Sequence, residues 1–105
     1  MKALISILLI LMLSDTGFPQ NKRLPNLGDK AELKELRIGK IVQKDKSILK
    51  EIILIEIKEF GIIYEKKKGL HDLFIESIDY IEFPETKWGP LRIHFIDNKP
   101  IAYLI

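Results

Sequence analysis

The sequence contains no cysteine, and this absence excludes every bond and site that needs a thiol. Small exported domains often supplement a small core with disulfide bonds, which this chain cannot form. Attachment to a membrane through a lipidated N-terminal cysteine is excluded for the same reason. We therefore expect the hydrophobic core to stabilise the folded chain by itself.

Histidine is almost as scarce, since the chain has two, His71 and His94. A zinc site needs three or four ligands, so carboxylates such as Asp72 or Glu82 would have to supply the rest. Their spacing matches no known ligand pattern. The sequence therefore predicts no metal site, and His94 is expected on a solvated strand face beside Arg92.

The motifs of nucleophilic and phosphate chemistry are also missing. Ser47 and Ser77 lie in short polar turns, and neither has a G-x-S-x-G setting or a glycine-rich loop nearby. We predict no catalytic residue and no cofactor, so the chain is not expected to be an enzyme. The alternative is a small hydrolase or carbohydrate-active protein with a carboxylate site among Asp72, Glu76, Asp79 and Glu82, because spacing alone cannot reveal paired acids.

The charges show no large excess of one sign. Lysine and arginine number 17 and aspartate and glutamate number 15, which gives a net charge of +2. Because charges of both signs alternate along the chain, no basic patch for a nucleic acid is expected.

No apolar run is long enough to cross a membrane. The longest, residues 3–13, has eleven residues and spans only about half of a bilayer core as a helix. Lys2 precedes it and a polar stretch follows it, which is the layout of a secretory signal peptide. We predict a signal peptide over residues 1–20, cut between Ser14 and Gln20, and a secreted or periplasmic protein. The alternative is an ordinary buried helix. Such a helix would show a polar face with a spacing of about 3.6 residues, but Ser6 is the one polar residue in this stretch.

The exported part begins with a linker at residues 21–28, where one proline, one glycine and scattered polar residues indicate little structure. Residues 29–105 are expected to form one domain. Asp29 can cap a short helix that ends at Arg37, with Glu32 reaching back to the cap and Leu33 and Leu36 on one face. Alternatively, Leu36 opens the first strand.

Isoleucine alternating with charge from residue 38 onward indicates strands, since β-branched side chains fit a pleated sheet. The strands are expected at 37–43, 48–59, 62–65, 70–75, 79–83, 91–95 and 101–105. In the second, Ile53, Ile55 and Ile57 share one face; a helix is the rival there. We expect a bulge, bend or short turn at Gly61, and a hairpin tip at residues 66–69, where Gly69 can supply a positive φ if the turn needs one. The predicted fold is mainly β: a small antiparallel roll, barrel or sandwich of six to seven strands, with the helix over one end or face.

Two surfaces are candidates for partner contact. Trp88 with Lys87 lies in the longest loop, residues 84–90, and either anchors a partner or folds back as a lid over the domain. Ile101 and Tyr103 lie on a last strand without a polar tail, which as an unpaired edge would recruit other chains. The hypothesis is a non-catalytic exported domain that binds another protein or an envelope component, with a homodimer through an edge strand as one form.

Overall fold

The structure is a computed structural model that describes residues 24–105, so the predicted signal peptide lies outside the described residues. The prediction of a mainly β fold is confirmed. Seven antiparallel strands form one sheet, accompanied by the short helix α2 (Lys30–Lys34). The strands are β1 (Ile38–Gln43), β2 (Ile48–Ile57), β3 (Gly61–Lys66), β4 (Gly69–Phe74), β5 (Ile78–Phe83), β6 (Leu91–Ile96) and β7 (Lys99–Leu104).

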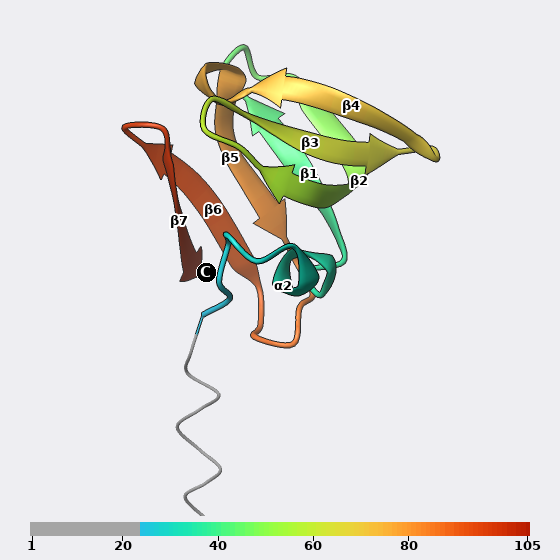
Figure 1. Ribbon diagram of the computed structural model, residues 1–105, viewed down its shortest axis with the longest axis vertical. Helices are drawn as coiled ribbons and strands as arrows, with labels where there is room; N and C mark the ends of the chain where they lie inside the picture. Colours follow the sequence, from blue (N-terminus) through green and yellow to red (C-terminus); the bar gives the residue numbers. More distant parts are fainter. Residues whose placement is uncertain (1–23) are drawn as a thin grey trace, which may run out of the picture.

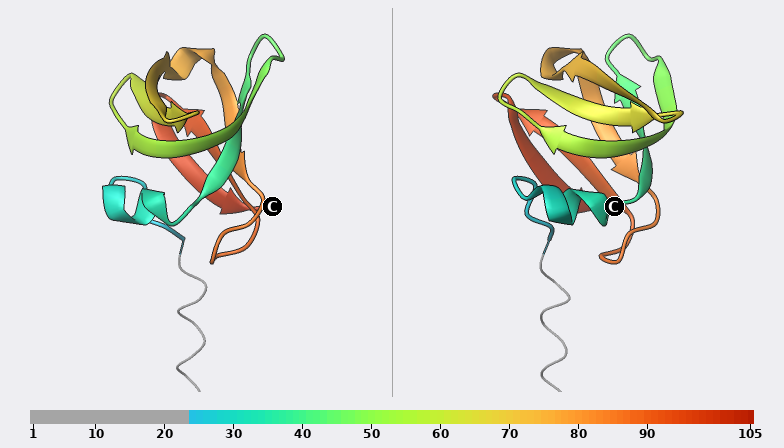
Figure 2. Two further views of the ribbon diagram at one scale, coloured as in Figure 1. Left: turned by 90° about the vertical axis from the view of Figure 1, so that its right-hand side faces the viewer. Right: turned by 45° about the vertical axis from the view of Figure 1, so that its right-hand side comes forward.

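The sheet order is β4-β3-β2-β1-β5-β6-β7, so most neighbours are joined by hairpins and β1 pairs across the chain with β5. The sheet curls strongly around one face, and α2 lies at one end of the curl (Figure 1). Two further views show the same curved arrangement, with the β3–β4 hairpin across from β6 and β7 (Figure 2). The sheet does not close, because β4 and β7 are its two edges.

The core lies on the concave face of the sheet. Its fully buried side chains come from the helix segment and from the inner strands, each worth roughly 1.5–3 kcal/mol of burial free energy. They are Leu33, Leu36, Ile41, Ile52, Leu54, Ile62, Ile81, Phe83, Leu91 and Ile93. This set supplies the apolar core that a chain without disulfides requires.

The helix is shorter than predicted. Asp29 caps it as expected, since its carboxylate accepts a hydrogen bond from the Ala31 N–H at 2.9 Å. Glu32 reaches back beyond the cap and accepts from the Asn26 N–H at 2.7 Å. Leu36 lies outside both the helix and the first strand, because Arg37 adopts a positive φ of 66° that turns the chain before β1.

That turn also decides which face of β1 is buried. A strand that opened at Leu36 would place Ile38 and Val42 on the same face as Leu36, but Gly39 and Ile41 face the core and Ile38 is exposed. Gly39 is required there, since a Cβ at this position would lie 2.6 Å from the backbone oxygen of Glu82.

Two bulges in β2 change its predicted faces. The register to β1 shifts by one residue between Leu49 and Ile52, where Glu51 has a positive φ of 54°. The register to β3 shifts between Leu54 and Glu56. Ile52 and Leu54 therefore face the core, and Ile53 and Ile55, which were expected to share the face of Ile57, are half-buried on the other side.

Gly61 closes the turn between β2 and β3, at the place where a bend or turn was predicted, since the Lys58 N–H donates to the Gly61 oxygen at 2.7 Å. Gly61 is the first residue of β3, and a Cβ there would lie 2.8 Å from the backbone oxygen of Leu73. Gly69 is the first residue of β4. The positive φ angles of the β3–β4 turn belong to Lys67 and Lys68, at 53° and 66°, so the lysines themselves form the hairpin tip.

Candidate functional site

One side of β7 is an open sheet edge that pairs with no strand of residues 24–105 (Figure 1). Along an antiparallel pair, the backbone groups of successive residues point alternately toward the partner strand and away from it. The Ile105 N–H donates to the Pro90 oxygen at 3.0 Å, so Tyr103 and Ile101 also point toward β6. Pro100, Ala102 and Leu104 consequently direct their backbone groups outward, and Pro100 is the one of these without an N–H.

The side chains along this edge are uncharged from Pro100 to Ile105. Ile101 and Tyr103, both singled out from the sequence, are 45% and 38% exposed. Leu104 and Ile105 are exposed as well. Natural edge strands usually carry charges that prevent pairing with other chains, and this stretch of β7 has none.

Tyr103 is held in position by a row of stacked rings across three strands. Its ring centroid lies 5.3 Å from that of His94 on β6, and His94 lies 5.5 Å from Tyr80 on β5. The interplanar angles are 37° and 15°, so neighbouring rings cover one another's faces. The row therefore packs Tyr103 against the neighbouring strands on this face of the sheet.

Arg92 ties the same three strands together by charge. Its guanidinium donates to the Glu82 carboxylate at 3.1 Å and lies 4.3 Å from the centre of the Tyr80 ring. Burial lowers the pKa of Arg92, but hydrogen bonds to Glu82 and Tyr103 outweigh it and leave the pKa above its ordinary value. Arg92 thus stays charged, and among the described residues its Nε and the Nε2 of His94 have no hydrogen-bond partner.

The Trp88 loop lies beside the far end of β7. Trp88 is half-buried and packs against the core cluster, and the Lys87 ammonium lies 4.9 Å from the centre of its ring. Lys87 also pairs with Glu35 at 2.5 Å. A Cβ on Gly89 would lie 3.7 Å from the Leu104 side chain. The structure therefore brings the loop next to the β7 edge, and Lys87 is one of its exposed residues.

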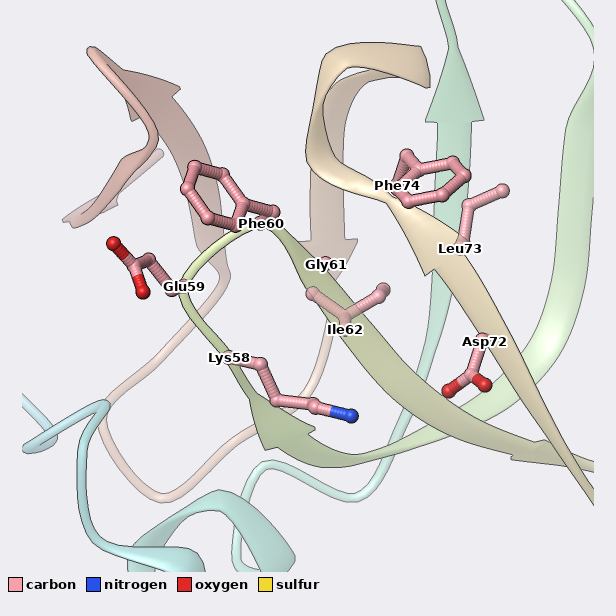
Figure 3. A pocket seen from close by; sticks show the side chains of 8 residues that line it. All are labelled: Lys58, Glu59, Phe60, Gly61, Ile62, Asp72, Leu73 and Phe74. Carbon is pink, nitrogen blue, oxygen red and sulfur yellow. The ribbon is translucent and has the colours of Figure 1, made fainter.

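The opposite edge carries a different surface. β4 presents Phe74, and the turn before β3 presents Phe60; they are 67% and 60% exposed. Both line an open pocket of about 360 Å³, together with Asp72, Glu59 and neighbouring residues (Figure 3). Unlike the stretch from Pro100 to Ile105, this edge has charges along it, including Asp72 and the Lys66–Lys68 tip.

The carboxylates considered for a hydrolytic site are not collected at one place. Asp72 lines the pocket on β4, whereas Glu82 lies on β5 and is paired with Arg92. Glu76 and Asp79 are exposed, in the 3-10 turn after β4 and on β5. Within residues 24–105, no three histidine, aspartate or glutamate side chains gather where they could hold a metal ion.

His94 and Tyr80 are the site residues that sequence reasoning missed. The alternation of Arg92 and His94 with apolar residues predicted a solvated outer face, but it did not indicate what would lie beside them. The stack depends on the β5–β6 and β6–β7 registers, in which Glu82 faces Arg92 and Arg92 faces Tyr103. Correct registers for both the β5–β6 pair and the β6–β7 pair would have placed Tyr80, His94 and Tyr103 on one face of the sheet.

Comparison of the chain with protein families, with curated proteins and with solved structures gave no match. In the part of the chain that the structure describes, no helix is both long and apolar enough to span a bilayer. The function must therefore be inferred from the open edge of β7 and the exposed apolar side chains beside it.

Proposed function

We propose that this protein is an exported, non-catalytic domain that binds an extended segment of another protein chain, secreted or in the envelope, along the open side of β7. Addition of a strand to a sheet edge supplies main-chain hydrogen bonds for affinity, and side chains next to the edge supply selectivity. The segment can belong to a different protein or to a second copy of this chain.

One observation carries the proposal: β7 is an edge strand without charges from Pro100 to Ile105, beside exposed apolar side chains. The edge at β4 is a weaker candidate, because Asp72 is at one of its outward positions and three lysines stand at its end. A charge at the edge disfavours strand addition, since pairing would remove water from it.

Neighbouring residues give the edge a defined shape. Tyr103 is fixed by the ring stack with His94 and Tyr80, so it loses little side-chain entropy on binding. Ile101 lies next to it on the same face, and the Trp88 loop with Lys87 lies at the far end of the strand. A bound segment with apolar residues at alternate positions would cover Ile101 and Tyr103 together.

The test places a photo-crosslinking amino acid at position 101 in the cells that make the protein. A discrete cross-linked product is expected, and Ala102→Pro should abolish it because it removes an outward N–H without breaking the β6–β7 pairs. Ala102→Ser keeps that N–H and should keep the product. A thermal melt of each variant checks that it is folded.

A second probe at Lys44, in the turn between β1 and β2, is the positional control. Equal cross-linking from Lys44, or an unchanged product from folded Ala102→Pro, would overturn the proposed role of the β7 edge.

A further inference from the structure

We infer that the strand that binds to β7 is β7 of a second copy, which gives a two-fold symmetric dimer with Ala102 opposite Ala102 of the second copy. This inference rests on the proposed function of the same edge. It goes further in naming the partner and the register of the pairing.

The register follows from the two faces of the sheet. In a continuous antiparallel sheet, residues directly opposite each other point to the same face. In a two-fold symmetric pair of β7 strands, one residue must therefore lie directly opposite its own copy, and the axis passes midway between these two copies. Because Pro100, Ala102 and Leu104 direct their backbone groups outward, an axis at Ala102 aligns these groups with their counterparts in the second copy.

Ala102 at the axis gives a ladder with few unpaired groups. The two Ala102 residues exchange two hydrogen bonds, and each Leu104 N–H donates to the Pro100 oxygen of the other copy. The missing N–H of Pro100 removes one bond from each of these outer pairs, so four bonds form in all. The small Ala102 side chain points to the inner face, where it packs against the core cluster and lines an open pocket with residues 24–28 and Pro100.

The side chains opposite one another are also complementary. Ile101 of one copy faces Tyr103 of the other, twice, and pairs of a β-branched with an aromatic residue are favourable across strands. No charged residue lies among the five paired positions, so no like charges meet although the two surfaces are identical.

Neighbouring registers are less favourable. An axis at Ile101 leaves only two hydrogen bonds, because Pro100 then faces Ala102, and it places Lys99 against Tyr103. An axis at Tyr103 brings together two Tyr103 rings that are already stacked on His94. The chain is thus most self-complementary about Ala102.

The absence of native cysteine makes the register measurable by single-cysteine variants. Facing residues in a hydrogen-bonded pair have Cα atoms about 5.5 Å apart, which is within the disulfide range of roughly 4.4–6.8 Å. Ala102→Cys in the chain purified from its cells should therefore form a disulfide-linked dimer on mild oxidation. Lys44→Cys, far from the edge, should stay monomeric. Faster linkage of Tyr103→Cys than of Ala102→Cys would overturn the Ala102 register.

Sedimentation of the protein without cysteine tests the dimer itself. We expect its mass to double between about 1 and 100 µM, the range of a weak dimer, and Ala102→Pro to stay monomeric while Ala102→Ser dimerises. A wild-type monomer throughout this range would overturn the inference. If the position-101 probe then still captures a different protein, and Ala102→Pro abolishes that product, the proposed function stands and only the choice of partner fails. If neither happens, both fail.

Discussion

Gly39 shows how a single residue determines the packing between neighbouring strands. It lies on the core face of β1, where a Cβ would approach the Phe83 ring to 2.5 Å and the Glu82 backbone oxygen to 2.6 Å. The ring could rotate slightly, but the backbone oxygen belongs to the β1–β5 ladder and cannot move without disturbing it. Any side chain at position 39 must therefore push β5 away from β1.

Gly39→Ala is expected to lower the free energy of unfolding by about 1–3 kcal/mol, the usual cost of overpacking a core. Urea denaturation followed by Trp88 fluorescence measures the change, because Trp88 packs against the same core. Gly28→Ala is the matched control, since the nearest atom to its added Cβ would be at 3.5 Å. An equal effect of the two substitutions would contradict the close approach at Gly39.

Residue-scale features of the candidate site were only partly predictable. Ile101 and Tyr103 follow from alternation and from their place on the last strand. The contact between Tyr103 and His94 could not be predicted in this way, because it depends on the register in which β6 pairs with β7. Trp88 shows the same limit: its loop was evident, but the core cluster against which it packs is assembled from distant segments.

At the scale of elements, the β3–β4 hairpin is closed by an unfavourable turn. Lys67 and Lys68 both have positive φ, which costs an ordinary L-residue roughly 1–2 kcal/mol. Two-residue hairpin turns of this kind favour glycine at the second position. The sequence instead has Gly69 one residue later, as the first residue of β4.

Lys68→Gly should raise the free energy of unfolding by about 0.5–1 kcal/mol, because relief of strain exceeds the entropy that glycine adds to the unfolded chain. Thermal and urea unfolding measure it. Lys44→Gly is the control, since Lys44 has no positive φ and loses only entropy; it should not stabilise. A Lys68→Gly protein less stable than wild type would show that the lysine side chain matters more than its backbone angle.

The positions of most strands could be predicted from the sequence, but the side of each strand that faces the core could be predicted only in part. Alternation and turn residues located all seven strands, but the two bulges of β2 could not be seen in the sequence. A bulge adds one residue to one strand only, so it becomes visible when the partner's register is known.

At the scale of the whole molecule, strand order decides where function can lie. The pairing of β1 with β5 joins the β1–β4 and β5–β7 groups into one sheet and leaves β4 and β7 as its edges. Local patterns could not predict this, because the pairing joins segments about forty residues apart. β7 has no charged side chain from Pro100 to Ile105, whereas β4 carries Asp72, so topology and composition together favour the β7 edge.

The proposed function also requires export, which depends on residues 1–20. We expect the mature chain in the soluble envelope fraction or the medium, with a new N-terminus between Asp15 and Asn21 by mass spectrometry. Leu8→Arg should block this, because a charge inside the apolar run costs about 2.5–3.5 kcal/mol on insertion. Leu8→Ile keeps the run apolar and should be exported normally. An intact Met1 on cytoplasmic wild-type protein would contradict export, and the partner of β7 would then have to be sought inside the cell.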